Sequence, residues 1–247
     1  MIIKVKGIKT NFEVLGDGKN IIILHGWGDN LRSWHNVQNL LSKKFRVFTI
    51  DLPGFGQSDL PKLPWGIQNY SKFLRDFISE LEIKKPILIG HSFGGKITAY
   101  FASENSDLLN KIILVSAQGV ESKSIRAKIK IVIFKLLKKI FILFGLKTDQ
   151  LSQKFGSRDY RKAGKLRNTF IKIVNQNIKD RLPRIKIPTL IIWGDKDKEL
   201  SVKNSKMFEK LIPNSKTRIV WNTGHFCHIE QGQTLVRLIT NFVDEHV

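Results

Sequence analysis

The sequence predicts an α/β protein with a mostly parallel β-sheet that is flanked by helices. Short, continuous apolar runs such as 20–24, 86–89 and 111–115 are typical of strands that are buried on both faces. They alternate with segments whose apolar residues recur at helical spacing, for example 31–42 and 69–82. This alternation indicates parallel strands joined by crossover helices. With 247 residues, of which 42% are hydrophobic, the chain can bury one large core or a core with an insertion.

The individual elements follow from the same patterns. An N-terminal strand pair is expected around Gly7, and a Pro/Gly turn is expected over 52–58. The expected strands cover 2–6, 10–15, 20–24, 45–51, 86–89, 111–115, 188–193 and 217–221. The expected helices cover about 31–42, 69–82, the segment up to about 104, 202–211 and a closing stretch to about 246.

The alternation breaks at about residue 118, where no obvious buried strand follows for almost 70 residues. Residues 118–186 instead predict helices over about 125–144 and 159–180. We therefore divide the chain into an α/β core, 1–117 and 187–247, and a helical cap, 118–186, that lies over the sheet.

Positive charge is concentrated in this cap. The whole chain carries 42 Lys or Arg and 21 Asp or Glu, a net charge of +21. Residues 118–186 hold 19 Lys or Arg and four Asp or Glu, which gives +15 of that total. A basic cap would suit an acidic carrier protein or an anionic membrane surface, although a lid with a solvated basic edge explains it as well. We expect no nucleic acid as partner, because the chain has no aromatic stacking platform or recognised module.

One short motif, Gly90-His91-Ser92-Phe93-Gly94-Gly95, lies between a predicted strand and a predicted helix. Two glycines that flank a serine at a distance of two residues favour a tight strand-to-helix turn that presents the hydroxyl at the sheet edge. The Phe93 N–H would then be free to donate to a developing oxyanion at the helix N-terminus.

Further polar residues follow other strands of the predicted sheet. His25-Gly26-Trp27-Gly28 follows 20–24, Asp195 and Asp197 follow 188–193, and His225 follows 217–221. Parallel sheets place their chemistry at such strand ends. The Trp27 N–H is the second oxyanion donor that we expect, and the candidate side chains occur in the order Ser, Asp, His.

These segments resemble the α/β-hydrolase fold over nearly the whole chain. The resemblance implies that Ser92 is the nucleophile, that His225 is the general base, and that an acid orients the imidazole. In the family pattern Trp-Gly-x-x-Asp the second acid has this role, which favours Asp197 and leaves Asp195 to brace the turn. The family often has proline four residues after the acid, where this chain has Ser201.

Other residues near these motifs have more modest expected roles. His25, Gly26, His91 and Phe226 are expected to line the substrate pocket, although His25 is better explained by local hydrogen bonds that shape the oxyanion loop. We expect His228 at the surface or behind His225. Structural roles are expected for Asp51, Ser58 and Cys227. No metal and no cofactor is expected, since His225, Cys227 and His228 cluster in sequence without a distant ligand.

Composition also bears on the compartment. A single cysteine excludes an internal disulfide and favours a reducing environment. The N-terminus lacks an uninterrupted apolar region, and no run reaches the ~18 apolar residues of a membrane span. The expectation is a cytoplasmic protein.

A serine nucleophile indicates acyl transfer, and esters are the commonest substrates of similar proteins. The leading expectation is a carboxylesterase that acts on a small or medium acyl ester. One alternative is an ester linked to acyl-carrier protein, as in the pimeloyl acyl-carrier-protein methyl ester carboxylesterases, which share His-Gly-Trp-Gly. Others are a carbon–carbon bond hydrolase and an inert scaffold that binds a hydrophobic ligand or an acidic partner.

Overall fold

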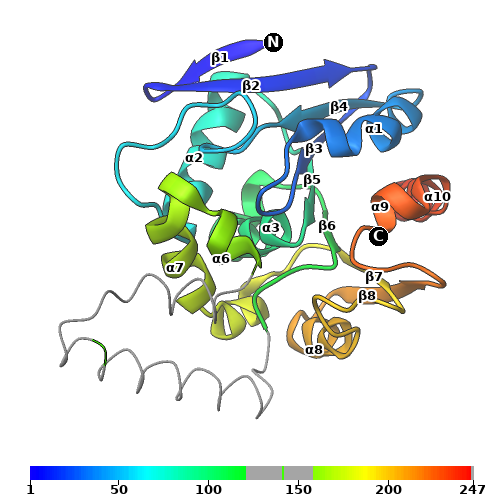
Figure 1. Ribbon diagram of the computed structural model, residues 1–247. Helices are drawn as coiled ribbons and strands as arrows, with labels where there is room; N and C mark the ends of the chain where they lie inside the picture. Colours follow the sequence, from blue (N-terminus) through cyan, green and yellow to red (C-terminus); the bar gives the residue numbers. More distant parts are fainter. Residues whose placement is uncertain (121–140, 142–157, 246–247) are drawn as a thin grey trace.

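The protein is represented by a computed structural model, which describes residues 1–120, 141 and 158–245. Its centre is an eight-stranded sheet in the order β1-β2-β4-β3-β5-β6-β7-β8 (Figure 1). The strands are β1 (Ile2–Val5), β2 (Ile8–Leu15), β3 (Lys19–Leu24), β4 (Phe45–Ile50), β5 (Ile87–His91), β6 (Ile112–Val115), β7 (Thr189–Gly194) and β8 (Ser215–Val220).

Only the N-terminal edge of the sheet is antiparallel. Strand β1 pairs with β2, and β2 pairs with β4, in antiparallel register. From β4 to β8 every neighbouring pair is parallel, so the carboxyl ends of β3, β5, β7 and β8 lie along one edge of the sheet. The expected mostly parallel sheet is confirmed.

Helices cover both faces of this sheet (Figure 1). The helical elements are α1 (His35–Leu41), α2 (Ile67–Glu80), α3 (Phe93–Glu104), α6 (Arg158–Lys162), α7 (Arg167–Asn175), α8 (Lys203–Leu211), α9 (Cys227–Glu230) and α10 (Gly232–Asp244). Short 3-10 turns occur at η1 (Leu31–Trp34), η2 (Ser106–Leu108), η3 (Gly164–Leu166) and η4 (Lys179–Arg184).

Two separate apolar layers hold the sheet between the helices. Successive side chains of a strand point to opposite faces, so Ile22 and Leu24 belong to the apolar layer that includes residues of α2, α3 and α8, whereas Ile21 and Ile23 belong to the layer that includes residues of α1 and α10. Because both faces are buried, the strands read as continuous apolar runs rather than as alternating patterns. This is the physical reason that the sequence indicated a doubly covered sheet.

The cap region differs from its prediction. The segment expected as one helix over 159–180 is divided into α6, η3, α7 and η4. Gly164 has a φ of +49°, a left-handed conformation that ends α6 and redirects the chain. The other expected cap helix, 125–144, lies outside the described residues apart from residue 141.

Two general expectations can also be compared with the described part of the chain. Between residues 118 and 186, the described stretches contain helical turns and no strand. Across residues 1–120, 141 and 158–245, no helix combines the length and the apolar character that crossing a bilayer requires.

Candidate active site

The turn between β5 and α3 holds Ser92 in a strained backbone conformation, with φ +51° and ψ −110°. The flanking glycines are required by space. A Cβ atom on Gly90 would lie 2.4 Å from the carbonyl oxygen of Gly94, and one on Gly94 would lie 2.3 Å from that of Leu24. Such distances are far below van der Waals contact, so the two glycines let β5 and α3 meet at a sharp corner. Ser92 is 5% exposed at this corner and lines a cavity.

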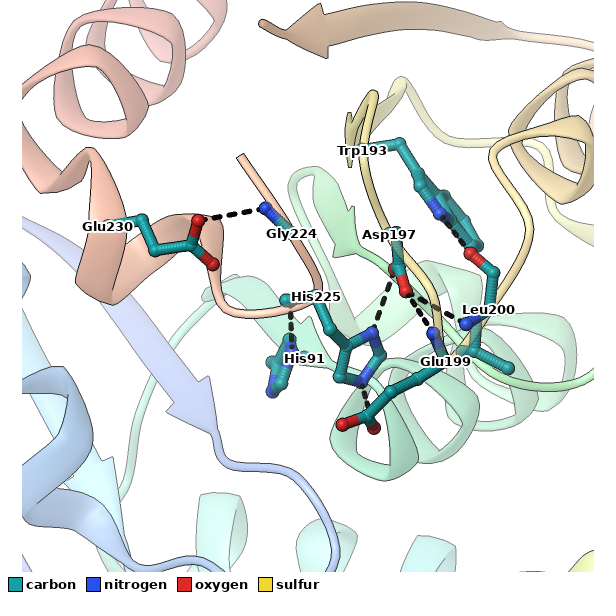
Figure 2. Close-up of polar contacts among 8 residues, drawn as sticks. All are labelled: His91, Trp193, Asp197, Glu199, Leu200, Gly224, His225 and Glu230. Atoms are coloured by element: carbon teal, nitrogen blue, oxygen red, sulfur yellow. Dashed lines mark hydrogen bonds and ion pairs between the residues drawn. The ribbon is translucent and has the colours of Figure 1, made fainter. Parts of the chain in front are cut away.

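His225 and Asp197 form a buried pair beside this cavity (Figure 2). His225 Nδ1 lies 2.8 Å from Asp197 Oδ2, and the two side chains are only 4% and 0% exposed. A buried carboxylate at this distance accepts the Nδ1 proton, so Nε2 of the neutral ring is the proton acceptor. Within the described chain, no hydrogen bond joins Ser92 Oγ to His225. This is common before substrate binds.

The loop that carries Asp197 is held by its own hydrogen bonds. Asp197 Oδ1 accepts the backbone N–H groups of Glu199 at 2.9 Å and Leu200 at 2.8 Å, and Trp193 Nε1 donates to the Leu200 carbonyl at 3.0 Å (Figure 2). The first acid has a different partner, because Asp195 Oδ1 accepts the Thr223 N–H at 3.2 Å. Asp195 therefore braces the turn, and Asp197 faces the imidazole, as the residue pattern predicted.

Two contacts fix the backbone around His225 (Figure 2). Glu230 Oε2 accepts the Gly224 N–H at 2.9 Å. His91 Nε2 lies 2.9 Å from the His225 carbonyl, which can only accept, so His91 carries its proton on Nε2. Burial lowers the pKa of His91 well below its usual value, with further contributions from the nearby His228 and His225. His91 is therefore neutral, and it supports the loop of His225 while also lining the cavity.

The segment after β3 lies against the Ser92 turn. A Cβ atom on Gly26 would lie 3.5 Å from Ser92 Cβ. The rings of Trp27 and Phe93 pack edge to face, with their centroids 5.4 Å apart. As the first residue of α3, Phe93 has no partner for its N–H within the helix. The backbone bonds of the described residues also include none from the Trp27 N–H. Both amides are therefore without a backbone hydrogen-bond partner among the described residues.

His25 has the local hydrogen-bonding role that the sequence favoured, and not the pocket-lining role that was also expected. It is fully buried and does not line the cavity. Its Nδ1 lies 2.7 Å from the Gly26 carbonyl, and its Nε2 accepts the Leu52 N–H at 3.0 Å. Both ring nitrogens are thus used to hold the segment before Trp27 against the turn that follows β4. Gly26, His91 and Phe226 do line the cavity.

Asp51 and Ser58 have structural partners, as expected. Asp51 accepts the backbone N–H groups of Leu31 and Gln57, each at 2.8 Å, and the Ser58 hydroxyl donates to the Asp51 carbonyl at 2.6 Å. These bonds hold the turn after β4 beside the cavity.

The cavity has a volume of about 930 Å³, within the range of small-molecule sites. Apolar side chains of Trp27, Phe55 and Leu166 form part of its wall. The apolar residues Leu166, Phe170 and Ile173 of the second expected cap helix predict a mostly apolar face toward Ser92. In the structure, Lys162 and Lys165 also line the cavity. The break at Gly164 explains the difference, since a continuous helical face does not exist there. Among the described residues, the other charged side chains that line the cavity are Asp29, Asp159 and Glu199.

The two residues that follow Phe226 are both buried: this was expected for the Cys227 thiol, whereas His228 was expected at the surface or behind His225. His228 is not at the surface. Its ring stacks on that of Trp34, with the ring centroids 4.3 Å apart and an interplanar angle of 9°. Burial lowers the pKa of His228 to about 3 and raises the pKa of the Cys227 thiol to about 12. Cys227 is accordingly a packed, protonated thiol. Within the described residues, no group of three or more His, Cys, Asp or Glu side chains has the arrangement of a metal site.

Comparison with known proteins agrees with this architecture. A family described as "alpha/beta hydrolase fold" matches residues 19–136, which include the Ser92 turn and the Trp27 segment. The order of the strands, the geometry of the Ser92 turn and the Ser-Asp-His order along the chain also indicate the α/β-hydrolase fold. The chain has the α/β-hydrolase fold.

Relatives of the protein match nearly the whole chain. An uncharacterized protein of Mycobacterium tuberculosis is 28% identical over 97% of this chain and 80% of its own length. The 2-hydroxy-6-oxo-2,4-heptadienoate hydrolase of Pseudomonas putida is 24% identical over 96% of this chain and 93% of its own length. A bacterial membrane phospholipase A has a similar fold, with a TM-score of 0.82 at 21% identity, over 99% of this chain and 85% of its own.

Two features of the candidate site were missed by the sequence-based prediction. Glu199 lies near His225 Nε2, and Lys162 and Lys165 reach the cavity from the cap. For Glu199 a signal existed, because it is only two residues from Asp197 in the same loop. For the lysines none did, since their position depends on where the cap helix breaks.

Proposed function

We propose that this α/β-hydrolase is a serine hydrolase that cleaves a carboxylic ester with a small or medium acyl group through an acyl-enzyme. The observation that carries the proposal is the buried His225–Asp197 pair, with Nδ1 and Oδ2 2.8 Å apart, beside a cavity that Ser92 also lines. A serine hydroxyl is a weak nucleophile unless a base accepts its proton. An imidazole whose Nδ1 is held by a carboxylate is such a base.

In the first half of the proposed reaction, Ser92 Oγ attacks the ester carbonyl carbon, and its proton moves to His225 Nε2. The carbonyl oxygen becomes an oxyanion and accepts the N–H groups of Trp27 and Phe93. The imidazolium is stabilised by Asp197. It then donates its proton to the alcohol oxygen, the carbon–oxygen bond breaks, and the alcohol leaves. In the second half, water repeats these steps at the acyl-enzyme and releases the acid.

The test combines a covalent probe with an ester assay. A fluorophosphonate probe should label the wild-type protein and not Ser92→Ala. Hydrolysis of p-nitrophenyl acetate and butyrate by Ser92→Ala should fall by at least about 10³-fold, because the nucleophile of a triad is not replaceable. The melting temperature reports whether the variant is folded. Ester hydrolysis that survives Ser92→Ala would refute the proposal, and failure to label the wild-type protein would favour an inert binding scaffold.

A second candidate is hydrolysis of a carbon–carbon bond in a product of aromatic-ring cleavage. The observation that favours it is the similarity along nearly the whole chain to the heptadienoate hydrolase of Pseudomonas putida. In that reaction Ser92, His225 and Asp197 would again be the catalytic residues. Comparing kcat/KM for 2-hydroxy-6-oxo-2,4-heptadienoate with that for p-nitrophenyl butyrate separates the two activities.

For the partner, we propose an acidic carrier protein that presents the acyl group to the basic cap. Residues 118–186 hold +15 of the +21 net charge, and Lys162 and Lys165 of this segment line the cavity. Attraction between oppositely charged surfaces weakens with salt. An ester attached to acyl-carrier protein should therefore be hydrolysed with a lower KM than the free ester, and the advantage should shrink between 50 mM and 500 mM NaCl. Equal KM values would contradict a carrier, and an advantage only with anionic vesicles would indicate a membrane instead.

A further inference from the structure

The imidazole of His225 lies between two carboxylates with different surroundings (Figure 2). On the Nδ1 side, Asp197 is completely buried. On the Nε2 side, Glu199 Oε2 is 3.6 Å away, and the Glu199 side chain is 59% exposed. Glu199 also lines the cavity that contains Ser92. The proposed reaction uses Asp197 and leaves the second carboxylate without a role.

The position of Glu199 is set by the residues of the site itself. Its backbone N–H donates to Asp197 Oδ1 at 2.9 Å, next to the equivalent bond from Leu200 at 2.8 Å. The same carboxylate thus orients the imidazole and fixes the backbone that carries Glu199. The backbone of Glu199 is therefore held in place, and its side chain extends from there toward His225 Nε2.

The charge of Glu199 is not neutralised by a basic side chain in the described structure. Among the described basic side chains, only the ring of His225, which is charged only when protonated, lies within 4.0 Å of this carboxylate; Lys162 and Lys165 line the same cavity at greater distances. This half-exposed carboxylate can therefore attract a cationic ligand and repel an anionic one in the cavity. Its influence extends over several ångströms and decreases with ionic strength.

The proposed reaction defines which part of the substrate comes near Glu199. His225 Nε2 must donate a proton to the leaving oxygen, which requires a separation of about 3 Å. Glu199 Oε2 lies 3.6 Å from the same nitrogen. The leaving oxygen is therefore at most about 7 Å from the carboxylate, and the group attached to that oxygen extends into the space that Glu199 lines.

We propose that Glu199 is a specificity-determining residue that selects the leaving group by charge. It favours alcohols that carry a cation, accepts neutral ones and disfavours anionic ones. This inference rests on the proposed function, because it requires that His225 protonates an alcohol.

Three butyrate esters with the same acyl group test the inference. Choline butyrate carries a cation, 3,3-dimethylbutyl butyrate is its neutral isostere, and 3-sulfopropyl butyrate carries an anion. The readout is kcat/KM for each charged ester divided by kcat/KM for the neutral ester. We call the two values the choline ratio and the sulfopropyl ratio. An effect of a substitution that is common to all esters cancels in both ratios. For a cation about 5 Å from the carboxylate at an effective dielectric constant of about 40–80, Glu199→Gln should lower the choline ratio about 4- to 15-fold.

Charge reversal and a distant charge provide the matched variants. Glu199→Lys should lower the choline ratio further and raise the sulfopropyl ratio above that of the wild type. Glu80→Gln removes one negative charge from an exposed position on α2 and should leave both ratios unchanged. Melting temperatures check that each variant is folded.

The outcomes separate this inference from the proposed function. If the wild type hydrolyses the neutral ester through Ser92 but Glu199→Gln leaves both ratios unchanged, the charge rule is overturned and the hydrolase assignment stands. The same holds if Glu199→Gln changes all three esters by an equal factor, since Glu199 would then act only through His225. If no ester is hydrolysed and Ser92 is not labelled, both proposals are overturned.

Discussion

At the scale of single residues, Asp195 and Asp197 lie in one loop but have different hydrogen-bond partners. Asp197 contacts the imidazole of His225 at 2.8 Å, whereas Asp195 contacts the Thr223 N–H at 3.2 Å. A carboxylate on Nδ1 both selects the tautomer and stabilises the imidazolium, which a bond to a backbone amide cannot do.

This difference predicts unequal effects of two matched substitutions. Asp197→Asn should lower kcat for ester hydrolysis by about 10³- to 10⁴-fold, because an amide cannot stabilise the imidazolium and can hold the wrong tautomer. Asp195→Asn keeps an acceptor oxygen for Thr223 and should change kcat by less than about tenfold. Steady-state kinetics on p-nitrophenyl butyrate measure both. Equal losses would mean that the acid has been assigned to the wrong residue.

Residue patterns predicted part of this site and could not predict the rest. Ser92, Asp197 and His225 each follow a strand, so local sequence was enough to nominate them. For His25, local sequence favoured hydrogen bonds over a place in the pocket lining, and both ring nitrogens are indeed used inside the fold. Glu199 was not predicted, because its relation to His225 Nε2 depends on a contact between residues 26 positions apart.

At the scale of elements, the junction of β5 and α3 depends on how closely backbones approach. Gly94 faces the end of β3, where an added Cβ would lie 2.3 Å from the Leu24 carbonyl oxygen. Neither backbone can move away, since both belong to the central sheet and its covering helix. The corner that exposes Ser92 therefore has little tolerance for side chains.

Gly94→Ala should lower the free energy of unfolding by at least about 2 kcal/mol, as expected for overpacking against an immobile backbone. Gly232→Ala on α10 is a suitable control. Its nearest contact would be Asn36 Nδ2 at 3.0 Å, a side-chain atom that can rotate away. We expect a change of less than about 1 kcal/mol there. Urea unfolding followed by circular dichroism measures both, and similar losses would refute the steric explanation.

Strands were easier to predict than the cap helices. The buried strands at 19–24 and 189–194 were expected within one residue of their ends, because Pro, Gly and polar residues bound them. Apolar periodicity over 159–180 predicted one helix but carried no information on where it would break. Gly164 marks that break, yet a glycine inside a helical pattern often continues it.

At the scale of the whole molecule, stability and pH are linked through histidines enclosed in the fold. His91 and His228 lie with ring centroids 4.5 Å apart between the Ser92 turn and Trp34. Neither ring nitrogen of His228 has a hydrogen-bond partner in the described structure. Folding therefore requires neutral rings, and acid favours the unfolded chain, in which these rings are free to bind protons.

The sign and size of this effect can be predicted for His228. Its pKa is lowered to about 3 in the folded state, from the usual value of 6.5. Between these values only the unfolded chain binds the proton, so stability is complete above pH 6.5 and falls as the pH decreases. At pH 4.5 the loss from this residue is about 2–3 kcal/mol. His228→Phe keeps a ring against Trp34 and removes the titration. The loss in unfolding free energy between pH 7.5 and pH 4.5, measured with urea, should therefore be about 2–3 kcal/mol smaller in the variant. Using this difference cancels any change in packing that is independent of pH, and equal losses in the two proteins would show that His228 does not determine the acid sensitivity.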